Sequence, residues 1–392
     1  MPKFNFDEHG GGITSEIKKP SSNGSLSYRT YFISGFDPRG ATHYQRLFQA
    51  ELKASGHRLG RRNNQGLISR WSLQPIQVPS TPKNEQAVTE LCFLHWDDIA
   101  RENWPKEPLE VLKQCWLYAS FYFFQGCVFR VAMLCPGVAL CGAYPLLFFL
   151  FALSISITSA VLVIAGLNIF GITLALKALG GLIVAYLILL NSWQLAEKLG
   201  VIWLTRSILF THRLGQARDG ALLDRIKELA IEVIKLEEQN PAEKIRLVGH
   251  SSGTFVLVML AAELHRHPKA SIILSKLELL TLGQNFANLS VYPKAESFRK
   301  DLEVLAEEPL IPWRDVTSYQ DLLCFAGVNP FSSCGLSEPN RGSYPQMDLI
   351  DLANARKLNR RWKLLSHQFE IHFDYLRNQC KEVDLPNLLL TK

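Results

Sequence analysis

Charge is missing from one long part of this 392-residue chain. No Asp, Glu, Lys or Arg occurs from Val131 to Leu176, and after Lys177 none follows until Glu197. Soluble cores rarely contain so many consecutive residues without a charge, whereas a bilayer crossing needs about 20 apolar residues. The stretch therefore argues against a wholly soluble protein, and it is long enough for two membrane crossings.

Other absences exclude other classes of protein. The net charge is +6, but no basic block or basic stripe interleaved with aromatic residues occurs, which argues against nucleic acid as a partner. The eight cysteines include no C-x-x-C pair and several lie in apolar runs, so we expect reduced thiols and an intracellular catalytic part. No secretory signal is visible in Met1–Asn23, whose polar, Gly- and Ser-rich composition predicts a disordered tail.

The residues that are present point to one reactive group. Ile245–Thr254 (IRLVGHSSGT) reads as a short apolar strand that runs into Gly249–Gly253, and an apolar helix follows. G-x-S-x-G between a strand and a helix is the nucleophile elbow, in which the serine, here Ser251, occupies a strained turn. The flanking glycines let strand and helix approach without Cβ clashes, and the helix N-terminus stabilises negative charge that develops beside the hydroxyl.

A second strand and loop complete this expectation. Tyr28–Ser34 is rich in β-forming residues and is followed by the Gly- and Pro-containing loop Gly35–Gly40. A loop of this kind is where a hydrolase places its second oxyanion donor, here the backbone N–H of Phe36 beside that of Ser252.

The positions of these two strands determine how often the chain crosses the membrane. One precedes the apolar stretch and the other, which leads to Ser251, follows it, so a shared sheet requires an even number of crossings. We expect two, at roughly Ala143–Ala165 and Ile172–Ser192, joined by a turn at Gly166–Gly171. Lys177 inside the second helix is expected to extend toward an interface or to face the partner helix.

Basic residues indicate the orientation of this hairpin. Its turn contains no Lys or Arg, whereas four basic residues flank its base: Arg130, Lys198, Arg206 and Arg213. Positive charge collects on the cytoplasmic side of membrane helices. We therefore expect a two-pass protein of the inner or plasma membrane with its catalytic part in the cytoplasm.

The segments around the elbow alternate between helix and strand. Ala221–Gln239 carries an apolar stripe at helical spacing, and strands are expected at Leu277–Leu282 and Ile311–Ser318. Alternation of this kind is typical of a parallel sheet with crossover helices. The fold class predicted is α/β, of the α/β-hydrolase type, with flanking helices and an inserted transmembrane helical hairpin.

Two further segments have local interpretations. Trp203–His212, which is apolar and basic, is expected to lie on the bilayer surface. Asp97 and Asp98 follow a strand expected at Leu91–His95, and we interpret them as a solvated strand end rather than a metal or acid/base site.

A serine needs a histidine to take its proton, and that histidine needs a carboxylate to fix its tautomer. In hydrolases with a nucleophile elbow the partners follow in the order serine, acid, histidine. Beyond the helix after the elbow only two histidines remain, and His372, among aromatic and aliphatic residues, is preferred to His367. Asp321, just past the end of a predicted strand, is preferred as the acid to Asp315, which lies inside that strand.

The chain resembles a known group of proteins in three places: Gly249–Gly253, the loop that begins Gly35-Phe36-Asp37, and the late segment His372–Leu376. Together they look like bacterial membrane-associated α/β hydrolases of lipase or esterase character, in which a two-helix hairpin interrupts the catalytic domain. The resemblance spans about Tyr28 to Leu376. It implies ester hydrolysis through an acyl-enzyme, with no metal or organic cofactor, and it identifies no particular substrate.

The sequence therefore predicts four regions: a polar tail at 1–27, an N-terminal part of the hydrolase domain at 28–130, the hairpin at 131–196 and a C-terminal part at 197–392. The leading hypothesis is a membrane-anchored serine hydrolase that acts on an acyl lipid or another apolar ester. The alternative is a membrane scaffold or interaction protein that keeps the fold without chemistry, and a pore formed by the hairpin is a third hypothesis. The oligomeric state does not follow from the sequence.

Overall fold

A computed structural model of the protein describes residues 26–76, 88–104, 107–217, 220–339, 344–352 and 367–377. These residues form a mixed α/β structure around a nine-stranded, mostly parallel sheet with strand order β2-β4-β5-β1-β6-β7-β8-β9, and β3 pairs with β4. The parallel strands are β1 (Leu26–Ile33), β5 (Val88–Leu94), β6 (Lys244–His250), β7 (Leu277–Leu282), β8 (Trp313–Thr317) and β9 (Gln346–Leu349). The antiparallel strands are β2 (His57–Leu59), β3 (Asn63–Gln65) and β4 (Ile68–Pro75). The tail expected at 1–27 lies outside the described residues except for its last two, which belong to β1.

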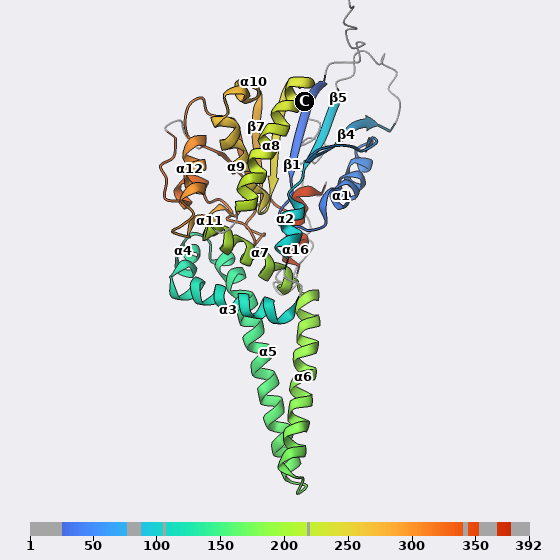
Figure 1. Ribbon diagram of the computed structural model, residues 1–392, viewed down its shortest axis with the longest axis vertical. Coiled ribbons are helices and arrows are strands. Elements are labelled where there is room, and N and C mark those ends of the chain that lie inside the picture. Colours follow the sequence, from blue (N-terminus) through green and yellow to red (C-terminus); the bar gives the residue numbers. More distant parts are fainter. Residues whose placement is uncertain are drawn as a thin grey trace, which may run out of the picture.

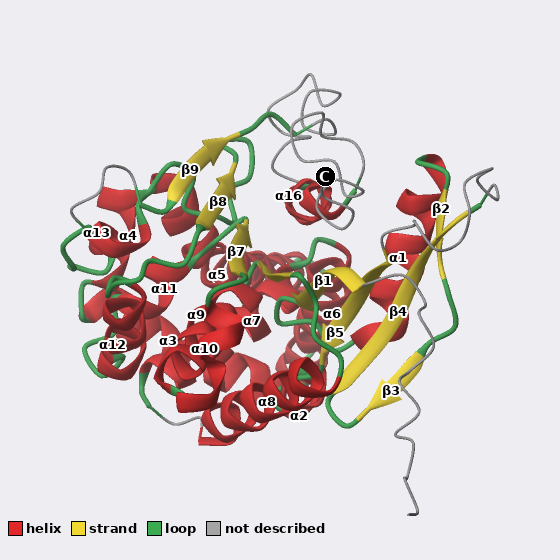
Figure 2. Ribbon diagram, turned by 90° about the horizontal axis from the view of Figure 1, so that it is seen from above, coloured by secondary structure: helices red, strands yellow, loops and turns green. Residues whose placement is uncertain are grey.

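Helices cover both faces of the sheet, as Figure 2 shows. On one face lie α1 (Gly40–Ala54) and α16 (Gln368–His372), and on the other lie α8 (Gly220–Gln239), α9 (Gly253–Arg266) and α12 (Glu296–Leu305). Side chains alternate across the strands, so that Phe32 of β1 joins one core while Tyr31 and Ile33 join the other. The apolar stripe predicted for Ala221–Gln239 is buried along α8, which confirms that prediction.

Two long helices extend from the sheet as a hairpin (Figure 1). They are α5 (Pro136–Asn168, 33 residues) and α6 (Leu174–Lys198, 25 residues), and both are long and apolar enough to cross a membrane. Each helix is longer than the predicted crossing, because it continues beyond the predicted residues at the end nearer the sheet. Pro145 lies inside α5. Lys177 lies close to the tip of the hairpin, where its ammonium group donates to the side-chain oxygen of Asn168.

The strand before the hairpin pairs directly with the strand after it. Tyr28–Ile33 of β1 is in parallel register with Lys244–Gly249 of β6. Because neighbouring strands cannot lie on opposite sides of a bilayer, any crossings between them must be even in number, as the sequence argument required.

Three helices join the hairpin to the sheet. They are α3 (Pro108–Phe124), which runs across the base of the hairpin in Figure 1, α4 (Cys127–Leu134) and α7 (Val201–Gly215). The prediction that Trp203–His212 lies on the bilayer surface is wrong, because it belongs to α7, which packs against α3, α5 and α6 and buries Leu209 and Phe210.

The interpretation of Asp97 as a solvated residue is also wrong. Its side chain is buried at the start of α2 (Asp97–Glu102), where it accepts hydrogen bonds from His95 and Arg101. Asp98 is more exposed, and it forms an ion pair with Arg225 of α8. Both carboxylates therefore hold the end of β5 against helices.

A buried charge cluster ties the central strand to its neighbours. Arg29 of β1 is fully buried; its Nη1 donates to Glu237 Oε1 of α8 at 2.6 Å and its Nη2 to Glu90 Oε2 of β5 at 2.8 Å. Tyr31 also donates to Glu237, at 2.7 Å. Removing one partner of such a group leaves other charges buried without compensation.

We expect Arg29→Met to lower the free energy of unfolding by about 3–5 kcal/mol, because Glu237 would remain buried without a cation. The matched control is Arg314→Met, which removes an ion pair with Asp348 on a half-exposed arginine and should cost less than about 1 kcal/mol. Denaturant titration of the detergent-solubilised protein measures both changes. Equal losses would contradict a structural role for the Arg29 cluster.

Candidate active site

Ser251 lies on a tight turn between β6 and α9. Its φ is +57°, in the left-handed region that non-glycine residues rarely adopt. A Cβ on Gly249 would lie 2.8 Å from the carbonyl oxygen of Gly253, and one on Gly253 would lie 2.4 Å from that of Ser34. Both positions therefore require glycine. The backbone of Ser251 is held in place because its N–H donates to the Leu282 carbonyl at 3.0 Å.

The loop after β1 passes directly beside this serine. A Cβ on Gly35 would lie 3.0 Å from Ser251 Cβ and 3.4 Å from its Oγ. The loop is fixed by the buried carboxylate of Asp37, which accepts hydrogen bonds from the backbone and guanidinium of Arg39 and from the hydroxyl of Tyr44. Rigid backbone thus lies close to the Ser251 hydroxyl.

The two amides expected to bind an oxyanion belong to Phe36 and Ser252. Neither N–H donates a hydrogen bond to any part of the chain that the structure describes. Phe36 is buried, with its ring stacked on Phe210 of α7 at a centroid distance of 4.7 Å. Ser252 immediately precedes the first residue of α9. Phe36 lines the cavity that contains Ser251, and Ser252 follows the serine directly.

Asp321 and His372 form a buried pair. Asp321 follows β8 and His372 ends α16, and Asp321 Oδ2 lies 2.7 Å from His372 Nδ1. Burial by itself would raise the pKa of Asp321, but the interaction with His372 and the hydrogen bond from the backbone N–H of Leu323 together lower it. The carboxylate is thus ionised at neutral pH, and it favours the tautomer of His372 that carries its proton on Nδ1.

One cavity contains Ser251, His372 and Phe36. Together with its mouth it encloses about 880 Å³. Part of its wall comes from the helices around the hairpin base: Tyr118 and Tyr122 of α3, Val138 and Gly142 of α5, and Leu204 and Ile208 of α7. The buried Nε2 of His372 has no hydrogen-bond partner among the described residues, Ser251 Oγ included.

The reserve candidates lie elsewhere. Asp315 is fully buried within β8, where it accepts a hydrogen bond from Thr281 Oγ1 at 2.5 Å and where burial raises its pKa to about 7. His367 precedes α16 and does not line the cavity. The structure therefore brings Asp321 and His372 together and leaves Asp315 and His367 outside this group. No cluster of three or more His, Cys, Asp or Glu residues that could hold a metal ion occurs in the described ranges.

Sequence reasoning missed the part played by His250. Its Nε2–H donates to the backbone carbonyl of His372 at 2.9 Å, and the two rings lie 4.8 Å apart. Burial and the nearby His372 lower the pKa of His250 to about 3, so it is neutral. Its place next to Ser251 was the available signal, but a contact with a carbonyl more than 100 residues away is not visible in a sequence.

The ring of His372 also rests on a glycine. Gly283 follows β7 with φ of +57°, and a Cβ there would lie 3.1 Å from Cε1 of His372. The buried ring of Tyr375 contacts His372 edge-on, at a centroid distance of 6.2 Å. Three kinds of contact therefore hold His372 in place. Its carbonyl accepts a hydrogen bond from His250, its Nδ1 contacts Asp321, and its ring packs against Gly283 and Tyr375.

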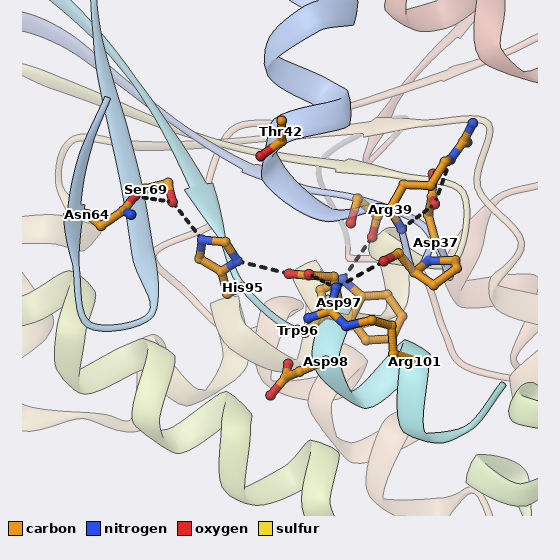
Figure 3. A network of polar contacts seen from close by, with 12 residues as sticks. Asp37, Arg39, Thr42, Asn64, Ser69, His95, Trp96, Asp97, Asp98 and Arg101 are labelled. Atoms are coloured by element: carbon orange, nitrogen blue, oxygen red, sulfur yellow. Dashed lines mark hydrogen bonds and ion pairs between the residues drawn. The ribbon is translucent and has the colours of Figure 1, made fainter. Parts of the chain in front are cut away.

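A second hydrogen-bonded set of serine, histidine and aspartate lies beside the loop after β1, as Figure 3 shows. Ser69 Oγ lies 2.6 Å from His95 Nε2, and His95 Nδ1 lies 2.9 Å from Asp97 Oδ1. Ser69 is fully buried, and its oxygen also accepts a hydrogen bond from Arg62 at 2.7 Å. None of the three residues lines the cavity that contains Ser251. This series ties β4, β5 and α2 together, and it gives no substrate access to its serine.

Comparison with protein-family models, curated proteins and solved structures found no match. The geometry of the site is therefore the basis on which a function can be proposed.

The low pKa of His250 predicts a pH-dependent stability. Below a pH of about 6.5, His250 is protonated in the unfolded chain but stays neutral in the folded protein. The free energy of unfolding therefore falls as the pH drops from about 6.5 toward 3, by up to about 1.4 kcal/mol per pH unit. We expect His250→Gln, whose amide can still donate to the His372 carbonyl, to reduce this slope. Unfolding titrations at several pH values measure it, and an unchanged slope would show that His250 is not the group responsible.

Proposed function

We propose that the protein is a membrane-anchored serine hydrolase that cleaves an acyl ester. The observation that carries the proposal is that His372, paired with Asp321 at 2.7 Å, lines the same cavity as a serine held on a left-handed turn between two obligatory glycines. Each feature has a purely structural explanation when taken alone. Their meeting in one cavity is what favours catalysis.

The proposed reaction proceeds in two steps. Ser251 Oγ attacks the acyl carbonyl while His372 Nε2 takes its proton, and the collapse of the tetrahedral intermediate releases the alcohol, which receives that proton from His372. Water then attacks the acyl-enzyme by the same route in reverse, which yields the carboxylic acid and restores Ser251. Asp321 holds the His372 tautomer and stabilises its charged form.

The negative charge on the carbonyl oxygen would be stabilised by the N–H groups of Phe36 and Ser252. These amides are free of other partners within the described residues. The N-terminus of α9 adds the positive end of its helix dipole. Removal of a single oxyanion donor typically costs about 2.7–4 kcal/mol in such enzymes.

The arrangement of the strands supports an α/β-hydrolase-type organisation. The oxyanion loop follows β1, the serine follows β6 and the acid follows β8, so all three lie at the carboxyl edge of the parallel strands. The sheet order places β5 on one side of β1 and β6 on the other, and ligands of open α/β sheets bind at such a point. The chain order Ser251, Asp321, His372 is also that of the α/β hydrolases.

The cavity favours an apolar substrate. About half of its lining residues are aromatic or aliphatic, among them Phe36, Tyr118 and Ile208. The polar atoms without a described partner there include the hydroxyl of Tyr122 and the side-chain oxygen of Asn285. It lies against the base of a hairpin able to cross a membrane. An acyl lipid or another apolar ester is therefore the substrate class we propose, with the site on the cytoplasmic side because basic residues flank the hairpin base.

A scaffold without chemistry is the second candidate, and one observation favours it. His372 Nε2 forms no hydrogen bond to Ser251 Oγ in this structure. Catalytic hydrogen bonds are often long in enzymes without substrate and shorten when it binds. A direct test of reactivity separates the two candidates.

We expect the purified protein to react with a fluorophosphonate probe and to hydrolyse a short-chain nitrophenyl ester, and Ser251→Ala to abolish both. The matched control is Ser69→Ala, which alters the buried serine of the other Ser–His–Asp series and should keep the labelling. Fluorescence of the labelled band and ester hydrolysis are the measurements. Equal labelling of wild type and Ser251→Ala would end the assignment.

The acid can be tested in the same way. Asp321→Asn should lower kcat by about 10⁴-fold, because an amide cannot fix the productive tautomer of His372. Asp315→Asn, which changes the buried acid that does not contact His372, should keep kcat near wild type. Steady-state kinetics on the nitrophenyl ester measure both, and a larger loss for Asp315→Asn would contradict the role given to Asp321.

A further inference from the structure

The helices α3 and α4 carry large apolar side chains that no described part of the protein covers. Trp116 is 65% exposed, Phe124 87% and Met133 89%. Four more residues share this exposed surface: Leu109, Leu112, Leu117 and Phe129. Exposed apolar surfaces of this extent mark a binding face for a protein or a membrane.

A third membrane crossing by these helices is excluded by the sheet. By length and composition α3 and α4 could form one broken span, with a bend of 70° between them. That span would make three crossings between β5 and β6 and would place these strands on opposite sides of the bilayer. Yet β5 and β6 both pair with β1. The pair therefore does not cross the bilayer, and both of its ends lie on the side of the sheet.

Only one face of the pair is open. The opposite face of α3 is buried through Val111, Tyr118 and Tyr122, and α4 buries Val131 in the core. Arg130 of α4 donates to the carbonyl of Val291, at 3.4 Å. The open side is mostly apolar but also carries the exposed Lys113, one turn from Leu109 and Leu117. A lysine beside an apolar surface can extend its ammonium group to the headgroups, so this face still fits the surface of a bilayer.

The open face continues into the surface of the hairpin. A groove lies between α3 and the hairpin. Counted with the open space at its mouth, it measures about 840 Å³. It is lined by Leu112, Cys115 and Trp116 of α3, by Leu146, Phe149, Leu150, Ala152 and Leu153 of α5, and by Leu189, Ser192 and Trp193 of α6. Ser192 supplies the one hydroxyl in this lining, so the groove is a place for hydrocarbon rather than for a polar ligand.

The hairpin itself indicates the depth of this groove. Lys177 near the tip and Lys198 at the end of α6 are about 32 Å apart at 1.5 Å per residue, close to the hydrocarbon thickness of about 30 Å. Trp193 and Leu189 lie about 8 and 14 Å inside the Lys198 end by the same rise. Helices in the plane of a membrane surface bury their apolar face about 5–10 Å deep. The groove, and α3 beside it, therefore lie at one surface of the bilayer.

We propose that α3 and α4 lie in the plane of the bilayer surface, with their exposed face and the groove behind Trp116 covered by lipid acyl chains. The occupant is lipid because the exposed face is continuous with the surface of a hairpin that can span the bilayer. Figure 1 shows α3 running across the base of that hairpin. The reverse face of α3 lines the cavity with Tyr118 and Tyr122, so one helix separates that cavity from the membrane. The placement does not depend on the proposed chemistry.

Quenching by brominated lipids tests this placement. The full chain is reconstituted in phosphatidylcholine bilayers with bromine either near the headgroup end of the acyl chain or near its terminal methyl, and tryptophan emission is compared between variants. We expect Trp116→Phe to lose part of the quenching, more of it with the shallow bromine than with the deep one. Trp71→Phe alters a buried tryptophan of β4. It should leave unchanged the amount of emission that the brominated lipid removes.

Trp193→Phe is the control on the hairpin and should lose quenching whenever the hairpin is inserted. Loss for Trp193→Phe without loss for Trp116→Phe would overturn the proposal, because α3 would then lie away from lipid, in water or against another protein. Greater loss with the deep bromine for Trp116→Phe would overturn it in the other direction, because α3 would then enter the bilayer core as part of a re-entrant pair. Neither result depends on whether the protein is an esterase.

Discussion

The pairing of β1 with β6 is the contact on which the rest of this structure depends. Ile33 lies opposite Gly249 although the whole hairpin lies between them in the chain. This pairing brings the loop that contains Gly35 against Ser251. It also requires any membrane crossings between the two strands to be even in number. The position of the Gly35 loop beside Ser251 and the parity of any crossings are thus consequences of one parallel register, which buried Arg29 helps to hold through Glu90 and Glu237.

The candidate site combines two kinds of structure. The sheet supplies reactive groups from the carboxyl ends of its strands, where backbone geometry is well defined. The helices next to the hairpin supply much of the cavity wall through Tyr118, Tyr122 and Ile208. Hydrogen bonds from Leu323 and His372 satisfy the buried carboxylate of Asp321, so its charge persists in surroundings that would otherwise favour protonation. Ser69 has a similar hydrogen-bonded series, but it is fully buried and does not line the cavity that contains Ser251.

Local patterns predicted much of this arrangement. The strand and helix around Ser251 are encoded within a few residues, and the position of Asp321 just beyond a strand was enough to expect it at the edge of the sheet. The structure places it beside His372, although the catalytic roles stay predictions. Burial was harder to predict: α7 has the composition of a surface helix, but α3 and α5 pack over it. Similarly, the hydrogen-bond partner of His250 is the carbonyl of His372, which lies at the end of α16 and far along the chain.

The length of α5 has a physical consequence. Its 33 residues span about 50 Å, which exceeds a hydrocarbon core of about 30 Å, and the excess forms part of the cavity wall at Val138 and Gly142. Pro145 lies between the two portions and removes the helical hydrogen bond to the Cys141 carbonyl, where helices bend most readily. Membrane helices tilt when the bilayer becomes thinner. In a hairpin that spans a bilayer, a change in the tilt of the outer portion would therefore bend α5 at Pro145, next to the residues that line the cavity.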